Sequence, residues 1–460
     1  MATQASLAKG TRDFYGDELS KRQFMIAIIE KHFKRFGFSR IETPSFENYA
    51  TLMGKYGEEG DRLIFKILKS GDYLAKANTS ALEAQDSQAL TSSISDKALR
   101  YDLTVPFARF VVQHQNELAF PFKRYQIQPV WRADRPQKGR FREFTQCDAD
   151  VVGADSLWQE VELLQLYNSI FSDLGLKEQH KVTVKLNNRK LLSGIAEAFG
   201  IQERLSSFMV ILDKLDKIGS EGVATELKSQ GFDPSIWETL ATFLDQNVSV
   251  ESRLERLRTL FASSEIGAKG IEEMQFVLDQ TAQLSLDSLS LSFDLTLARG
   301  LHYYTGTLFE VSAPNSVQLG AIGGGGRYDD LTASFGGKDL SGVGISFGLD
   351  RIYLVLEELG LFPSTIGDQI EVLVLHLTDT DPLMALDLVA KLRAEGVSSE
   401  FYPEAAKPAK QYKYAEKRKA MNVAFWNTEA NSWVIKNMKT SEQQEFQLES
   451  LQTILPLNRD

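Results

Sequence analysis

Basic side chains concentrate in one short part of the chain, between Pro121 and Arg142, where Asp134 is the one acidic residue. Guanidinium groups bind phosphate oxygens in pairs, so this segment could hold a triphosphate. A hairpin at a sheet edge that keeps these charges in solvent explains the composition equally well. The basic residues are Lys123, Arg124, Arg132, Arg135, Lys138, Arg140 and Arg142.

The pattern predicts an antiparallel hairpin of two strands, Lys123 to Asp134 and Arg142 to Val152, joined by a long basic loop. Because side chains alternate along a strand, every second residue of the second strand lies on the same face. An aromatic ring beside carboxylates is unusual for a face in plain solvent, and could instead take a base and an ammonium group. That face carries Phe144, Gln146, Asp148 and Asp150.

A separate arginine, Arg299, lies between strand patterns and next to apolar residues. A buried charge without a partner is costly, so Arg299 is either part of an ion pair or a functional cation. The pattern leaves both interpretations open. His302, three residues later, is by its pattern more often a satisfied polar residue than a catalyst or a ligand.

Other elements must position these side chains. Residues 100 to 105 alternate as a strand does, and Pro106 suits the first position of a helix that runs to Gln115. Such a strand would deliver Asp102 and Thr104 to the start of the helix. Four consecutive glycines, Gly323 to Gly326, follow a predicted strand over 318 to 322. They lack the GxxxxGK(S/T) and GxGxxG patterns, so they favour a tight exit from a strand over a phosphate-binding loop.

Helical spacing of apolar residues predicts a helix over 18 to 36, followed by a strand over 38 to 46. Pro44 interrupts that strand, which predicts an edge or interface position. Helical spacing also dominates residues 189 to 290, which indicates an inserted helical domain, and it returns for a helix between Gly348 and Gly360.

A new pattern begins after Pro363: a strand over 370 to 377, a helix over 384 to 395 and a strand over 397 to 402. This β-α-β order predicts a separate C-terminal domain. Within it, basic residues recur at helical spacing with Tyr414 between them, which suits a looped single strand of nucleic acid or a solvated helix. The basic residues in question are Lys410, Lys413 and Lys417.

Composition narrows the class of protein. The chain has 460 residues, 43% hydrophobic and 25% charged, which is typical of a globular chain of several domains. No stretch is apolar enough to span a membrane and no secretory signal is evident, so we expect a cytoplasmic protein. A single cysteine and five scattered histidines give no disulfide framework and no zinc spacing. The net charge of −11 means that any nucleic-acid contact must be local.

Several of these segments resemble the motifs of class II aminoacyl-tRNA synthetases. The segment that ends in Pro44, the segment 122 to 153, and Gly342 to Arg351 are similar to motifs 1, 2 and 3 of that class. Other segments resemble the histidyl-tRNA synthetase family in particular. These are Lys9 to Phe14, Leu99 to Pro106, Gln146 to Asp150, Arg299 to Gly306 and Gly325 to Asp329.

The resemblance implies roles for individual residues. It assigns Arg132 and Arg299 to catalysis at the α-phosphate and the substrate carboxylate. It assigns histidine binding to Asp102, Leu103, Thr104, Gln146, Asp150, Tyr303, Tyr304 and Tyr328. It assigns ATP binding to Arg132, Asp134, Arg142, Phe144 and Arg351, with Phe144 stacked on adenine. We assign tRNA binding to Lys410, Lys413 and Lys417.

The chain departs from the family pattern at two places. His302 stands where the family usually has aspartate, and Phe425 to Thr428 replaces an expected glycine-rich strand exit. The second departure concerns the segment that would follow the predicted basic helix of the C-terminal domain.

The resemblance implies an α+β fold: a class II catalytic domain on an antiparallel sheet (1–188 and 291–362), a helical insertion (189–290) and a C-terminal α/β anticodon-binding domain (368–460). The implied enzyme activates histidine with ATP and Mg²⁺ and charges its tRNA, as a cytoplasmic homodimer without a membrane partner. Alternatives are an inactive synthetase-like regulatory subunit of ATP phosphoribosyltransferase and a histidine sensor or RNA-binding module. Residues 368–460 and Arg299 argue against the regulatory subunit.

Overall fold

The computed structural model describes residues 5–244, 248–298, 303–364, 366–367, 369–378 and 380–454, without the side chains of Glu58, Glu59, Asp216 and Thr453. It divides into two compact units. The first comprises Met1–Asp13 and Arg22–Phe362, and the second comprises Phe14–Lys21 and Pro363–Asp460. Arg299 and His302 lie outside the described residues.

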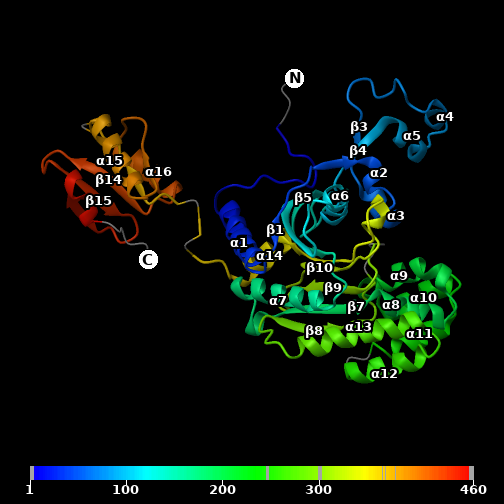
Figure 1. Ribbon diagram of the computed structural model, residues 1–460. Helices are drawn as coiled ribbons and strands as arrows, with labels where there is room; N and C mark the ends of the chain where they lie inside the picture. The colour runs from blue at the N-terminus through cyan, green and yellow to red at the C-terminus, as the bar shows by residue number, and fades with distance from the viewer. Residues whose placement is uncertain are drawn as a thin grey trace. The chain divides into compact units, whose positions relative to one another are not determined.

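An eight-stranded sheet forms the centre of the first unit (Figure 1). Its strand order is β1-β5-β6-β11-β10-β9-β7-β8, and all neighbours are antiparallel except β1 with β5 and β7 with β8. The strands are β1 (Ser39–Arg40), β5 (Phe122–Trp131), β6 (Glu143–Val152), β7 (Val182–Asn188), β8 (Leu289–Phe293), β9 (Thr307–Ser312), β10 (Gly323–Arg327) and β11 (Gly342–Gly348).

The helices α1 (Gly16–Arg35), α7 (Trp158–Asp173) and α14 (Leu349–Leu359) share a hydrophobic core with this sheet. Aromatic contacts tie them to it, since the Phe347 ring of β11 lies 5.9 Å from that of Phe33 and 4.7 Å from that of Tyr167, between centroids. On β6, the side chains of Cys147, Ala149 and Val151 enter this core. The alternate residues of β6 therefore lie on the opposite face of the sheet, as the sequence predicts.

The predicted hairpin is confirmed: β5 pairs with β6 in antiparallel register, from Phe122 opposite Val152 to Trp131 opposite Glu143. The predicted strand over 38 to 46 is shorter in the structure: only Ser39–Arg40 forms a strand, β1, and Pro44 lies outside it. The edge position applies to β1, which lies at the end of the sheet and pairs with β5.

Two expectations about local structure are wrong. The predicted strand over 100 to 105 ends earlier, as β4 (Ser95–Leu99), and α6 (Thr104–His114) begins two residues before Pro106. The Asp102 carboxylate accepts the backbone N–H of Val105 at 3.1 Å, which satisfies a free donor of the first helical turn and lets the helix start early.

The four glycines are themselves the strand β10 and do not form an exit from one, while residues 318 to 322 form no strand. Packing explains the glycines. A Cβ on Gly325 would lie 2.0 Å from the Gly344 carbonyl oxygen, and a Cβ on Gly326 would lie 2.6 Å from that of Thr307. Since real Cβ contacts are not that short, this strand can lie here only without side chains.

A smaller sheet, β2-β4-β3, also belongs to the first unit. Its remaining strands are β2 (Phe46–Asn48) and β3 (Lys66–Leu68). The short helices of this region are α2 (Tyr49–Leu52), α3 (Gly57–Leu63), α4 (Thr79–Glu83) and α5 (Ser87–Ile94). Buried residues of this region and of α6 form a second apolar core, which includes Tyr56, Tyr101 and Tyr328.

Helices occupy residues 189 to 281, as the sequence predicts, and in Figure 1 they gather beside β7 and β8. They are α8 (Arg189–Ala198), α9 (Leu205–Leu212), α10 (Leu215–Ser229), α11 (Pro234–Ala241), α12 (Val250–Leu260) and α13 (Glu265–Thr281). Their buried residues belong to the same apolar core as those of the eight-stranded sheet.

The second unit contains a five-stranded sheet of order β13-β12-β14-β15-β16. Its β-α-β start is confirmed: β12 (Val372–Val374) pairs in parallel with β13 (Ser399–Phe401), and α15 (Pro382–Ala394) connects them. The remaining elements are α16 (Pro408–Lys417), β14 (Asn422–Asn427), β15 (Ser432–Asn437) and β16 (Gln443–Phe446).

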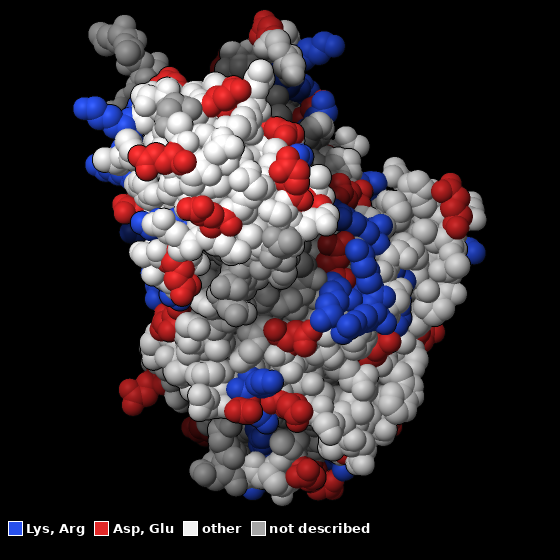
Figure 2. Space-filling view, turned by 90° about the vertical axis from the view of Figure 1, so that its left-hand side faces the viewer, with Lys and Arg blue, Asp and Glu red and all other residues white. Residues whose placement is uncertain are grey.

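The face of the molecule in Figure 2 carries scattered acidic side chains and one gathered group of basic side chains. A protein with a net charge of −11 can therefore still present a locally basic surface. Among the described residues, no helix is long and apolar enough to cross a membrane.

Candidate active site

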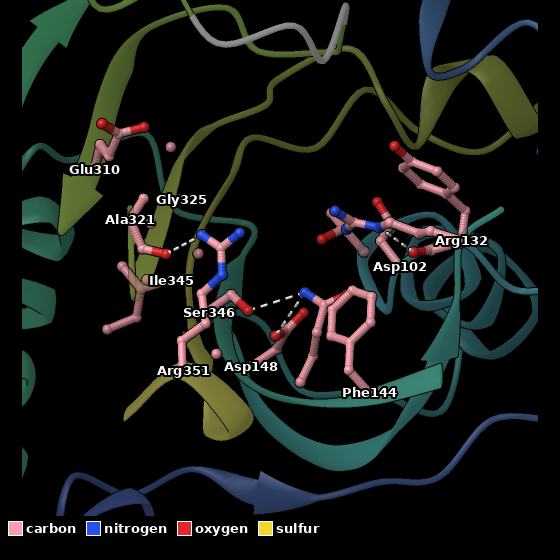
Figure 3. A pocket seen from close by; sticks show the side chains of 18 of the residues that line it. Asp102, Arg132, Phe144, Asp148, Glu310, Ala321, Gly325, Ile345, Ser346 and Arg351 are labelled. Carbon is pink, nitrogen blue, oxygen red and sulfur yellow. Dashed lines mark hydrogen bonds between the residues drawn. The ribbon is translucent and has the colours of Figure 1, made fainter. Parts of the chain in front are cut away.

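A cavity of about 430 Å³ opens on the polar face of the eight-stranded sheet. Its lining comes from β6, from the four glycines of β10, from β11 and from the loop that joins β5 to β6. Figure 3 shows Arg132 and Arg351 on opposite sides of the cavity, with Phe144 and Asp148 between them. Asp213, at the end of α9, brings the helical insertion to the lining.

Most of the predicted site residues meet in this cavity. Two do not line it: Leu103 is buried beside it and contributes its carbonyl to Arg124, and Arg142 contributes its backbone to the base of the loop. Arg299 cannot be placed, because it lies outside the described residues. The predicted residues that line the cavity are Asp102, Thr104, Arg132, Asp134, Phe144, Gln146, Asp150, Tyr303, Tyr304, Tyr328 and Arg351.

Asp102 is buried at the start of α6 and accepts three hydrogen bonds. Its Oδ1 accepts the Tyr56 hydroxyl at 2.9 Å and the Val105 N–H, and its Oδ2 accepts the Tyr303 hydroxyl at 3.0 Å. Burial raises the pKa of Asp102, while these hydrogen bonds and the charge of Arg132 oppose that rise. The Tyr303 hydroxyl also contacts Thr104. Two predicted histidine-binding residues are thus joined through one tyrosine.

Asp150 lies directly opposite Arg124 in the β5–β6 pair, and their side chains form a buried ion pair at 2.9 Å. The Tyr328 hydroxyl donates to the other carboxylate oxygen of Asp150 at 2.5 Å. Burial raises the pKa of Asp150, and Arg124 and Tyr328 oppose the rise. Arg124 itself is fully buried, lies over the Phe107 ring at 4.4 Å and donates to the Leu103 carbonyl.

Gln146 presents an acceptor without a partner. Its Nε2 donates to the Ser346 hydroxyl at 2.9 Å and to Asp148 at 3.4 Å, whereas its buried Oε1 has no hydrogen-bond partner among the described residues. Such a group in a cavity can accept a hydrogen bond from a ligand. Burial raises the pKa of Asp148 to about 7, the charge of Asp150 acts in the same direction, and Arg124 opposes both.

The cavity also carries cations and an aromatic ring. Arg132 donates to the Tyr101 carbonyl at 3.1 Å, and its guanidinium lies 4.3 Å from the Tyr101 ring and 5.2 Å from the Phe144 ring. Arg351 donates from Nε to the Gly139 carbonyl at 2.9 Å, which links α14 to the loop between β5 and β6. Two fixed guanidinium groups beside an aromatic face can bind a nucleotide.

Glu310 on β9 also lines the cavity, although the sequence did not single it out. Among the described residues, no group of three or more His, Cys, Asp or Glu side chains could hold a metal ion. One carboxylate with substrate phosphates is a common way to bind Mg²⁺, so the residues present fit a metal that arrives with a nucleotide.

Sequence patterns missed several residues that shape the cavity. Arg124 is one of the basic residues of the hairpin, and its charge alone does not distinguish a buried ion pair from a side chain in solvent. Its alternation with Gln126 and Gln128 on β5 was the available signal. Tyr56 and Ser346 come from segments far away in the sequence, and only the fold brings them to Asp102 and Gln146.

In the second unit, α16 carries the three lysines predicted to bind tRNA. All three are exposed, and the nearest described acid to Lys410 is Glu404, at 4.0 Å. The hydroxyl of Tyr414 donates to Glu400, and the Tyr414 ring packs against Tyr402, so this ring is partly withdrawn from solvent.

The fold and the cavity define a catalytic domain of the class II aminoacyl-tRNA synthetases. The family model described as "Histidyl-tRNA synthetase" matches residues 91–352, and the model described as "Anticodon binding domain" matches residues 371–456. The chain belongs to the histidyl-tRNA synthetase family.

Individual relatives agree with this assignment. The "Histidine--tRNA ligase" of Christiangramia forsetii is 56% identical over 98% of this chain and 99% of its own, and that of Flavobacterium johnsoniae is 52% identical over 99% and 100%. The crystal structure of histidyl-tRNA synthetase from Nostoc sp. PCC 7120 is 27% identical, covers 99% of this chain and 100% of its own, and has a TM-score of 0.77.

The raised pKa of Asp148 predicts a pH-dependent stability difference. At pH values between the pKa of Asp148 in the unfolded state, about 3.9, and its pKa in the folded state, Asp148 keeps a proton in the folded state that it has lost in the unfolded state. The stability contributed by this proton is complete below about pH 4 and is lost as the pH rises to about 7. Asparagine imitates the protonated form and does not titrate.

We therefore expect the unfolding temperature of Asp148→Asn, relative to that of the unchanged protein, to increase between pH 5 and pH 7.5 and then to level off. Thermal unfolding followed by circular dichroism measures this difference. A difference that stays constant over the same range would contradict the burial effect.

Proposed function

We propose that the chain is an active histidine–tRNA ligase, which activates histidine with ATP to histidyl-adenylate and transfers it to the 3′ end of its tRNA. The observation that carries this proposal is a single cavity that brings buried carboxylates together with Arg132, Arg351 and the ring of Phe144. Curated relatives at 49–56% identity are named histidine–tRNA ligases, which favours an enzyme over a regulatory subunit.

The buried carboxylates and their neighbours would hold histidine. Asp102, Thr104 and the Oε1 of Gln146 would accept the α-ammonium group, since a charged donor needs several acceptors in a buried site. Asp150 and Tyr304 would face the imidazole, with Tyr303 and Tyr328 as walls. An amino acid without imidazole nitrogens would leave these buried groups unpaired, and this would produce the selectivity.

The arginines and Phe144 would hold ATP. Phe144 would stack on adenine, and Arg132, Asp134 and Arg351 would contact the nucleotide, with the backbone of Arg142 supporting their loop. Mg²⁺ bound to the phosphates would neutralise part of their charge, and Glu310 would hold it together with phosphate oxygens.

In the first reaction a carboxylate oxygen of histidine attacks the α-phosphorus, the bond between the α-phosphorus and the α,β-bridging oxygen breaks, and pyrophosphate leaves with that oxygen. Charge accumulates on the nonbridging oxygens in the transition state. Preorganised guanidinium groups stabilise this charge without reorganisation. We assign this role to Arg132 and, from the resemblance of its segment, to Arg299.

We further propose the domain boundaries given above: a catalytic domain over 1–188 and 291–362, a helical insertion over 189–290 and an anticodon-binding domain over 368–460. The family model matched to 371–456 supports the last of these. We also propose a cytoplasmic homodimer, as in the family that the sequence resembles, with the edge strand β1 near the interface.

Pyrophosphate exchange with each of the twenty amino acids tests the activity. We expect exchange with histidine well above that with the other nineteen amino acids. Arg132→Ala and Arg299→Ala should each lower the rate with histidine by ~100-fold or more, the scale for removal of one preorganised electrostatic donor.

Arg135→Ala is the matched control, because Arg135 is exposed on the same loop and does not line the cavity. Its rate should remain close to that of the unchanged protein. Exchange with no amino acid, or equal with several, would refute the proposed function. Near-normal exchange by folded Arg132→Ala would refute the role of that residue.

The exposed lysines of α16 should contribute to tRNA binding. Lys413→Ala combined with Lys417→Ala removes two charges that can neutralise phosphates, so we expect weaker tRNA binding and a flatter dependence on salt. Filter binding at several salt concentrations measures both. A double variant of Lys391 and Lys439, exposed lysines elsewhere in the same unit, is the control. If the two double variants bind tRNA equally well, α16 is a solvated helix.

A further inference from the structure

The segment Lys9 to Asp13 is part of the N-terminal stretch that resembles the family, and its residues have no role in the proposed chemistry. It lies against the base of the loop between β5 and β6. The Gly10 carbonyl accepts the backbone N–H of Arg142 at 2.8 Å, and the Arg142 carbonyl accepts the backbone N–H of Arg132 at 2.9 Å. Arg142 therefore connects Gly10, through two backbone hydrogen bonds, to Arg132, which lines the cavity.

Residue 10 lies so close to the Arg142 side chain that glycine is required there. Gly10 has a φ of +85°, and a Cβ at this position would lie 2.8 Å from the Cγ of Arg142. A side chain at Gly10 would thus both strain the backbone and push Arg142 away.

Arg12 makes a second link. Its guanidinium lies 3.5 Å from the centroid of the Phe141 ring, and Phe141 lines the cavity. The same guanidinium donates to the Oδ1 of Asp350, which precedes Arg351 in the first turn of α14. Arg12 itself does not line the cavity.

Asp350 is a fixed point for these contacts. It is 5% exposed, and its Oδ1 also accepts from Arg22 at 2.6 Å, while its Oδ2 accepts the N–H of Thr145 at 3.1 Å. Arg12 therefore connects the loop, through Phe141, to a buried carboxylate at the start of the helix that carries Arg351.

We propose that Gly10 and Arg12 are positioning residues for nucleotide binding: they hold the loop between β5 and β6, through Arg142, Phe141 and Asp350, so that Arg132 and Arg351 face the nucleotide. This inference rests on the proposed function and deepens it. Much of the loop is exposed, at Arg135, Gln137, Lys138 and Arg140. Ordering such residues on binding costs backbone entropy, and contacts that order them beforehand reduce that cost.

The inference predicts an effect on ATP that histidine does not share. Asp102 and Asp150, proposed for histidine, are held by Tyr56, Tyr328 and Arg124, none of which contacts Gly10 or Arg12 in the described interactions. Loss of the links should therefore weaken nucleotide binding much more than histidine binding.

Titration calorimetry of the full chain with ATP and Mg²⁺, and separately with histidine, tests this. We expect Arg12→Ala and Gly10→Ala to raise the Kd of ATP by about tenfold, which corresponds to about 1.4 kcal/mol, with the Kd of histidine within about twofold of the unchanged value. Arg12→Lys keeps a cation for Asp350 but loses the planar group over Phe141, so its Kd should be intermediate.

Thr11→Ala is the matched control in the same segment, because the Thr11 hydroxyl donates only to the carbonyl of Ala8. An ATP affinity of Arg12→Ala or Arg12→Lys equal to that of Thr11→Ala would overturn the inference. Equal losses for ATP and histidine would also overturn it, because they would indicate a general defect. If the unchanged protein binds ATP but shows no exchange with histidine, the proposed function fails, and the ATP affinities still decide the role of this segment.

Discussion

The cavity depends on the buried ion pair between Arg124 and Asp150. Three carboxylates, Asp102, Asp148 and Asp150, are buried around one cavity, and burial raises the pKa of each of them. Arg124 is fully buried beside them, and its charge favours the ionised form of Asp148 and Asp150. Without this cation, Asp150, proposed to face the imidazole, would be buried beside Asp148 with no opposite charge, which would make its ionised form costly.

Glycine on the neighbouring strand makes room for that pair. Gly344 of β11 lies directly opposite Asp150, and a Cβ on Gly344 would lie 2.0 Å from the Asp150 carboxylate. On its other side Gly344 pairs with Gly326 of β10, the glycine strand. The sheet therefore has side chains that supply charge on β5 and β6, and glycines at Gly344 and Gly326 of the adjacent strands, where the carboxylate needs space. Strand glycines lower stability elsewhere, and here they give the cavity its depth.

Sequence patterns could predict the parts of this site that depend on local periodicity. Alternation along β6 placed Phe144, Gln146 and Asp150 on one face, and the structure brings them to one cavity. The start of α6 was misplaced because the Asp102 side chain, which is not part of any periodicity, caps the helix. The glycine strand was misread because its conformation depends on backbone contacts with β9 and β11, which no local pattern encodes.

The sequence also could not predict which charged side chains of the site form buried ion pairs. Arg124 and Arg135 are both basic residues of the same hairpin. Arg124 is buried against the Asp150 carboxylate, whereas Arg135 is exposed. Similarly, the contact of Gly10 and Arg12 with the loop spans more than a hundred residues of sequence, and a motif can mark such residues without showing what they touch.

Thermal unfolding of Arg124→Met, Asp150→Asn and the double variant tests the buried pair most directly. Removal of Arg124 alone leaves Asp150 as a buried charge without its cation, which is strongly destabilising. Neutralising Asp150 as well removes that charge. We predict that the double variant unfolds at a higher temperature than Arg124→Met. If the double variant unfolds at the same or a lower temperature than Arg124→Met, the pair is not the constraint on which the cavity depends.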